Sequence, residues 1–263
     1  VQPREQALLE LSEAKWAKGF VCRNCGNDTY YNIGTEFSRK CTACKKLDTV
    51  TAGTIFSKIR MPIEHALIVI KTMLNERTSK LTDVLKYIDN RYGIELDTKA
   101  TWKLIGKVEK AVPLHTVQYD KTLVIAMLSF KGKLQAILCS GMSKGKVRYF
   151  IKRVSIVRFK HDIESYLDKN SAKSTLVDVF DYGQVTKNVK RPLRIATINR
   201  KTWLKDESIN FSEVKQFKEF MSGHHIKAGI EHTFNFYCYL KNGGTYSTLL
   251  PFLINPEGAK LTP

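Results

Sequence analysis

The sequence is poor in acidic residues and has no long apolar run. Its 263 residues include 25 Asp and Glu against 43 Lys and Arg, a formal net charge of +18 at pH 7. No stretch of about 18 apolar residues is present, and the charged first residues lack the apolar core of a signal peptide. We therefore expect neither a membrane protein nor a secreted one. The sequence also lacks internal repeats and low-complexity segments.

The shortage of acidic residues leaves an excess of positive charge on both sides of residue 115, so a basic tail is not its source. Few soluble proteins need this much charge for solubility alone. The charge therefore predicts a polyanionic partner, and nucleic acid is the partner we expect. Hydrophobic residues make up 43% of the chain, which is enough for folded cores in one large or two modest domains.

Cysteine is also scarce, and four of the six cysteines form two close pairs. Cys22 and Cys25 form one C-x2-C pair and Cys41 and Cys44 form another, with 15 residues between the two pairs. This spacing is typical of a closed tetrahedral zinc site, which is structural because no coordination position is left open. The aromatic and β-branched residues between the pairs, with Gly34 at a turn, predict a hairpin. Together these features predict a zinc ribbon in a reducing compartment.

Three segments with helical periodicity follow the ribbon. The first is "MPIEHALIVIKTML", the second runs from Leu81 to Ile88, and the third covers residues 98–111 after Gly93. Three short helices with a Gly-containing turn before the last one resemble a helix-turn-helix. The final helix of that motif would enter the major groove of DNA. A three-helix packing spacer is the alternative. Trp102 in the third helix is expected to be a core residue.

The chain becomes rich in β-forming residues after Pro113. Three strand-like runs with short turns predict an antiparallel meander, and a helix over 161–170 then connects to a parallel strand at "STLVDVFD". A further strand and two helices complete the element order of an RNase H-like fold. The predicted class is therefore a multidomain α+β and α/β protein. Its expected domains are an N-terminal helix and zinc ribbon (1–56), a helix-turn-helix-like segment (57–112) and an RNase H-like catalytic domain (113–263).

Three acidic residues of the expected RNase H-like segment lie within or at the end of apolar stretches of sequence. Nucleases and transferases of this fold need carboxylates that together hold two divalent ions. Asp120 lies in the first expected strand, Asp178 ends the apolar part of the strand after the crossover, and Glu231 lies in the last long helix. An acidic residue in a strand can equally occupy an edge or a turn. Alternative ligands, if the elements are shifted, are Asp181, Glu213 and Glu219.

Two stretches carry a family resemblance: "LLELSEAKWAKGFVCRNCGN" and "RKCTACKKLDTVTAGTIFSKIRMPIEHALIVI". They resemble the N-terminal module of the zinc-ribbon insertion-sequence transposases, a group to which the eukaryotic Merlin elements are related. The most specific part runs from the second cysteine pair into "TVTAGTIF", a Pro and a helix. The resemblance is weaker from Pro113 onward. It implies a DDE domain, with Asp120, Asp178 and Glu231 at the acidic positions of the family.

The resemblance implies a DNA transposase that cleaves and transfers strands at element ends. Its cofactors would be a structural Zn²⁺ and a catalytic Mg²⁺ or Mn²⁺ held by the three carboxylates. Its partners would be double-stranded DNA, at terminal inverted repeats and target, and further copies of the chain in a homodimer or higher oligomer. The location would be the nucleoid region of a prokaryotic cytoplasm or a eukaryotic nucleus. The candidate DNA contacts are Lys40, Lys45, Lys46, Lys58, Arg60, Lys99, Lys103 and Lys107.

Two positions depart from the family pattern and keep an alternative open. Lys121 follows the first Asp where the family usually has Glu, and Ala228 stands where it usually has Asn. A positive side chain beside a metal ligand weakens cation binding, and some members use the Asn as third ligand in place of a Glu. The alternative is a catalytically inactive, domesticated transposase that binds DNA without cutting it.

Overall fold

The computed structural model describes residues 3–112, 123–130, 134–143, 146–154, 174–178, 194–197, 212–221 and 230–256. The chain divides into two compact units. The first contains residues 1–114 and 244–263, and the second contains residues 115–243. No helix in the described ranges is long and apolar enough to cross a membrane.

The first unit begins with α1 (Arg4–Lys15) and a small antiparallel sheet of order β1-β2-β3. The strands are β1 (Tyr30–Ile33), β2 (Thr35–Cys41) and β3 (Leu47–Thr49). Gly34, at a φ of 69°, forms the turn between β1 and β2. A positive φ is readily adopted by glycine because it has no Cβ. The predicted hairpin between the two cysteine pairs is therefore confirmed.

Three helices follow the sheet and confirm the predicted helical segment: α2 (Ile63–Asn75), α3 (Leu81–Tyr92) and α4 (Thr98–Ala111). Their ends have local causes in the sequence. Pro62 precedes the first turn of α2, Gly93 ends α3 at a φ of 63°, and the Asp97 side chain caps α4 by accepting from the Ala100 N–H.

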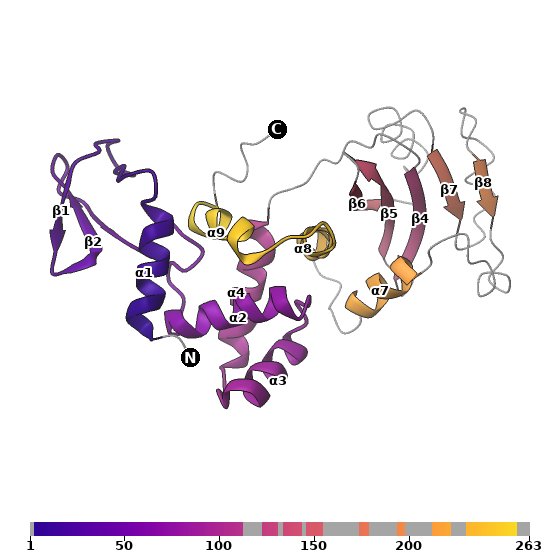
Figure 1. The fold of residues 1–263 in the computed structure, drawn as a ribbon, viewed down its shortest axis with the longest axis horizontal. Helices are drawn as coiled ribbons and strands as arrows, with labels where there is room; N and C mark the ends of the chain where they lie inside the picture. Colours follow the sequence, from indigo (N-terminus) through magenta and orange to yellow (C-terminus); the bar gives the residue numbers. More distant parts are fainter. Residues whose placement is uncertain are drawn as a thin grey trace. The chain divides into compact units, whose positions relative to one another are not determined.

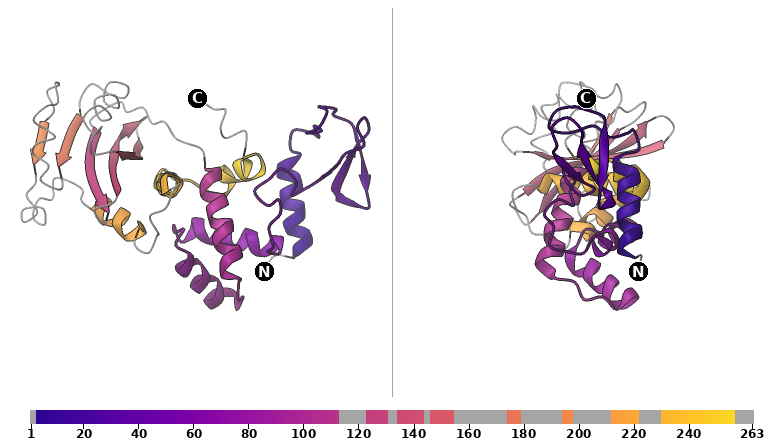
Figure 2. Two further views of the ribbon diagram at one scale, coloured as in Figure 1. Left: turned by 180° about the vertical axis from the view of Figure 1, so that it is seen from behind. Right: turned by 90° about the vertical axis from the view of Figure 1, so that its left-hand side faces the viewer.

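A fourth helix, α9 (Tyr246–Ile254), packs into this helical body although it comes from the end of the chain. It contacts α1, α2 and α4, and the Ile55 N–H donates to the Leu253 carbonyl at 3.0 Å. The left view of Figure 2 shows α9 (yellow) beside α4. The expected range 113–263 includes this helix, which belongs to the first unit. The core that α9 joins includes Leu11, Phe56, Leu67, Ile70, Met73, Ile88, Leu104, Leu249 and Leu253.

The prediction that Trp102 is a core residue is wrong, because its side chain is 53% exposed. The buried stripe of α4 consists of residues spaced by three and four positions: Thr101, Leu104, Ile105 and Val108. Trp102 follows Thr101 directly, and one residue turns a helix by about 100°. The indole therefore lies off the buried stripe.

The second unit contains a five-stranded mixed sheet of order β6-β5-β4-β7-β8 (Figure 1). The strands are β4 (Leu123–Phe130), β5 (Leu134–Ser143), β6 (Lys146–Val154), β7 (Ser174–Asp178) and β8 (Arg194–Thr197). The first three pair antiparallel, whereas β7 pairs parallel with β4 and β8 parallel with β7. These pairings confirm the predicted meander and the parallel strand. The helix expected at 161–170 lies outside the described residues.

Two helices accompany this sheet, α7 (Ser212–Met221) and α8 (Ile230–Lys241). The Phe217 ring of α7 packs against Phe234 and Tyr237 of α8, with ring centroids 5.5 and 4.9 Å apart. Helix α8 also packs against β6. Both helices were predicted from the sequence.

Candidate zinc centre and nucleic-acid interface

The four paired cysteines converge at the end of the β1–β2 hairpin. Their sulfur atoms all lie within 4.8 Å of one another. The Cys22 and Cys44 sulfurs are 3.5 Å apart, and the Cys25 and Cys41 sulfurs are 3.6 Å apart. A tetrahedral zinc with Zn–S bonds of about 2.3 Å separates its ligands by about 3.8 Å. The cluster therefore fits Zn²⁺ held by four thiolates.

The peptide groups of the second cysteine pair favour thiolates. Burial alone would raise the pKa of Cys41, but the N–H groups of Cys44 and Ala43 overcome this and lower it to about 6. The Lys46 N–H lowers the pKa of Cys44. At Cys25 the Asn27 N–H acts in the same direction, but the neighbouring Cys44 sulfur and burial prevail and raise the pKa to about 11. Four thiolates this close require a bound cation to balance their charge.

Asn27 supports the cluster from outside. Its side-chain amide donates to the Cys41 sulfur at 3.4 Å and to the Thr42 hydroxyl at 3.0 Å. Groups of this kind orient metal ligands and tune their basicity. Asn27 was not expected from the sequence, where only its place two residues after Cys25 could have indicated it.

A buried ion network attaches the ribbon to α1. The Lys15 ammonium donates to the Asp48 carboxylate at 2.9 Å and to the carbonyls of Thr49 and Ala52 at 2.6 and 2.8 Å. Arg23 reaches the same Asp48 oxygen at 3.0 Å. Gly53 leaves room for this arginine, since a Cβ there would lie 2.0 Å from an Arg23 nitrogen. Lys15 keeps all three donors occupied, so it is a positioning residue of the ribbon.

Aromatic rings hold a second cation of the ribbon. The Arg39 guanidinium lies 4.0 Å from the Trp16 ring centroid and 4.2 Å from the Tyr30 ring centroid. A planar guanidinium stacks well on such rings. Because Trp16 follows α1 and Tyr30 lies in β1, this contact orients the hairpin against the helix.

The basic residues predicted to contact DNA fall into two groups on the first unit. In and after the ribbon, Lys45, Lys46, Lys58 and Arg60 are exposed and Lys40 is half-buried. The Lys40 and Lys45 ammoniums lie 5.9 and 5.7 Å from the Tyr31 ring centroid. On α4, Lys99 and Lys103 are exposed. The Lys107 ammonium donates instead to the carbonyls of Ile55 and Ser57, each at 2.8 Å.

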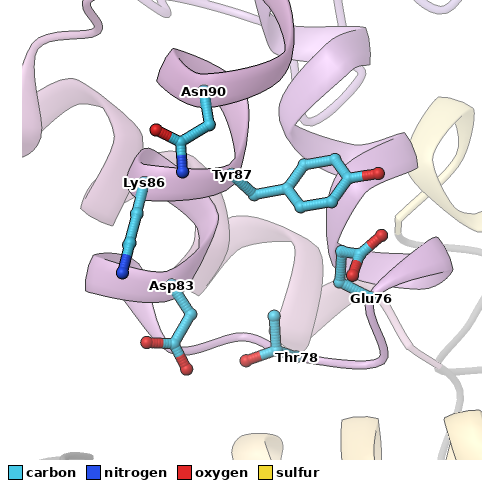
Figure 3. Close-up of a pocket in the computed structure, with 6 residues that line it drawn as sticks. All are labelled: Glu76, Thr78, Asp83, Lys86, Tyr87 and Asn90. Atoms are coloured by element: carbon cyan, nitrogen blue, oxygen red, sulfur yellow. The ribbon is translucent and has the colours of Figure 1, made fainter.

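A small open pocket of about 370 Å³ lies along α3. Figure 3 shows Glu76 and Thr78 on one side of it and Tyr87 on the other. The remaining lining residues are Asp83, Lys86 and Asn90. Within the described residues, the four cysteines are the only group of three or more His, Cys, Asp or Glu that could hold a metal.

The predicted acidic residues are placed only in part. Asp120 and Asp181 lie outside the described residues. Asp178 is the last residue of β7, opposite Thr197 of β8, and Glu231 is an exposed residue in the first turn of α8. Glu213 and Glu219 belong to α7. Within the described residues, no three of these carboxylates form a group that could hold a metal.

Comparison with known proteins identifies the ribbon. Residues 3–47 match the family model of the transposase zinc-ribbon domain of IS1595. No curated protein and no solved structure matches the chain significantly. The match and the cysteine cluster together support a structural Zn²⁺ and a transposase or DNA-binding role. They also support DNA as a partner, because zinc ribbons of transposases are generally DNA-binding.

Proposed function

We propose that the chain is a DNA transposase that binds element ends through its first unit and cleaves and transfers strands with its second. The observation that carries this proposal is the match of residues 3–47 to a transposase zinc ribbon. The exposed cations of the ribbon and α4, in a chain of net charge +18, support contact with the phosphates of duplex DNA.

The topology of the second unit supports the catalytic half of the proposal. An antiparallel β4-β5-β6 meander, with β7 parallel beside β4 and β8 parallel beside β7, agrees with the strand order expected for an RNase H-like domain. Asp178 lies at the carboxyl end of β7, directly beside the central strand β4. Residues at the carboxyl ends of parallel strands commonly form binding sites in mixed and parallel sheets.

The proposed catalytic residues are Asp120, Asp178 and Glu231. Their carboxylate oxygens are ligands that Mg²⁺ and Mn²⁺ prefer. Two such ions, when bound, activate the attacking oxygen and stabilise the leaving one. The role of the three carboxylates is to hold and orient the ions so that the attacking water, and later the freed 3′-hydroxyl, lies in line with the scissile phosphate. Two ends must be brought together, so we propose a dimer or higher oligomer on DNA.

One observation favours the second candidate, a transposase-derived protein that binds DNA without cutting it. Ala126 pairs with Val177, so Asp178 is level with Met127, and β4 contains no carboxylate. Asp120 lies seven positions before Met127, and an extended chain rises about 3.3 Å per residue. If the chain before Leu123 continued β4 in a straight line, Asp120 would lie too far from Asp178 for the two to share an ion. Cleavage therefore requires a different path for the chain there.

The position of α8 places a similar condition on Glu231. Helix α8 packs against β6, and β6 is separated from β7 by β5 and β4 in the sheet. Neighbouring strands lie about 4.8 Å apart, so β6 and β7 are separated by roughly 14 Å. The Glu231 carboxylate can share an ion with Asp178 only if the first turn of α8 lies nearer to β7 than β6 does.

Nicking of supercoiled plasmid DNA in Mg²⁺ or Mn²⁺ tests the two candidates. The wild type is compared with Asp120→Asn, Asp178→Asn and Glu231→Gln, which remove the charge and keep the shape. Asp89→Asn, an exposed residue of α3, is the control. Metal-dependent nicking that is lost in all three variants supports the transposase. DNA binding without nicking by the wild type supports the second candidate, and nicking that persists in the three variants contradicts the proposed site.

A further inference from the structure

The exposed face of α4 has an unusual composition. Its exposed residues are Thr98, Lys99, Trp102, Lys103 and Lys110, and none of them is acidic. The one glutamate of the helix, Glu109, is only 9% exposed. Among the large hydrophobic residues exposed in the described part of the chain, Trp102 has the largest side chain.

The lysines and the indole form one surface cluster. Lys99 lies three positions before Trp102 and four before Lys103, and side chains at these spacings are neighbours on a helix. Gly106 lies four positions after Trp102, where an added Cβ would have no atom within 4 Å. No side chain therefore projects from the helix at Gly106, on the C-terminal side of Trp102. A ligand can reach the edge of the indole ring there. Lys110 follows one turn later.

This combination of charge and apolar surface suits duplex DNA. The lysines match the phosphates, and the indole offers apolar area to the sugars and bases between them. A protein partner would have to supply acidic groups to three lysines around one tryptophan. A net charge of +18 also disfavours a second copy of this chain at the same face.

We propose that Trp102 contacts DNA and adds a salt-insensitive apolar component to the electrostatic binding by Lys99 and Lys103. The proposal rests on the DNA-binding role proposed above. The two kinds of contact differ in how their loss changes the dependence of DNA affinity on salt concentration. A lysine that binds a phosphate releases counterions, so its loss changes the dependence of affinity on salt. An apolar contact releases none, so its loss lowers affinity equally at every salt concentration.

The test measures affinity of the zinc-loaded full chain for a fluorescein-labelled, mixed-sequence duplex over a series of KCl concentrations. Trp102→Ala should weaken binding about tenfold, as expected for removal of a tryptophan at the centre of an interface, with the salt dependence unchanged. Trp102→Phe should recover most of this loss. Lys99→Ala should instead reduce the slope of log affinity against log salt by about 0.9. Since Trp102 is half-exposed, the thermal unfolding of the variants should stay close to that of the wild type.

Four outcomes decide the matter. Equal affinity of Trp102→Ala and wild type at every salt concentration overturns the role of Trp102 while leaving DNA binding intact. A change of slope in Trp102→Ala overturns the apolar assignment. Loss of self-association in Trp102→Ala, with unchanged DNA affinity, assigns the indole to a contact between copies. A wild type without any affinity for the duplex overturns the proposed function itself.

Discussion

Lys15 and Asp48 form a buried ion pair between α1 and β3, with the ammonium 2.9 Å from the carboxylate. Both side chains are 9% exposed. The two residues are 33 positions apart, and the lysine also donates to the carbonyl of Thr49, the last residue of β3, and to that of Ala52 in the segment that follows. The pair therefore fixes the position of the ribbon relative to α1, together with the Arg39 contact to Trp16.

Asp48→Asn should destabilise the first unit by about 3 kcal/mol, because it leaves the buried Lys15 charge without its partner. Denaturant unfolding of the zinc-loaded protein, followed by circular dichroism, measures the change. Arg23→Ala is the matched control. It removes the other cation bound to Asp48, but its side chain is 53% exposed, so its loss should cost less than about 1 kcal/mol. Equal losses in the two variants would contradict the structural role of Lys15.

Removal of zinc should unfold residues 17–56 and leave α2, α3 and the second unit folded. The ribbon has a small apolar core of its own, so its fold depends on the metal. Hydrogen exchange with and without a chelator measures this, and β1 to β3 should lose their protection. Cys41→Ser should lose the bound zinc, whereas Cys238→Ser in α8 should retain it. Protection of the ribbon that survives complete removal of zinc would refute the structural role of the metal.

Lys107→Met should lower stability more than it lowers DNA affinity. The ammonium donates to the carbonyls of Ile55 and Ser57, and burial lowers its pKa. Its loss leaves two carbonyls without this donor, at a cost of about 1 to 2 kcal/mol. Lys103→Ala, at an exposed position on the same helix, should reduce the salt dependence of DNA binding without affecting stability. A Lys107→Met protein of wild-type stability would contradict the assignment.

Local patterns in the sequence predict much of this architecture. The spacing of Cys22, Cys25, Cys41 and Cys44 predicts the zinc cluster, because each C-x2-C turn presents two sulfurs on one side. Apolar periodicity and caps such as Asp97 predict α2, α3 and α4, because these signals lie within a few residues of each other. The meander is also local, since only a few residues of sequence separate its strands.

Features that depend on distant residues could not be predicted in this way. The pairing of Lys15 with Asp48 and the packing of α9 on α1 join segments far apart in the sequence. The exposure of Trp102 depends on which face of α4 meets α2, and a tryptophan beside a buried stripe gives no local signal of its orientation. Convergence of Asp178 with other carboxylates is a long-range property of the same kind. It remains a prediction.

The central claim, that the first unit binds DNA, is tested most directly by the salt dependence of affinity for a mixed-sequence duplex. The full, zinc-loaded chain should lose about 1,000-fold or more in affinity as salt rises from about 50 to about 200 mM, because several exposed lysines replace counterions at the phosphates. A chelated sample should bind more weakly, with a smaller slope. An affinity that does not change with salt, or that is unaffected by loss of zinc, would contradict the account.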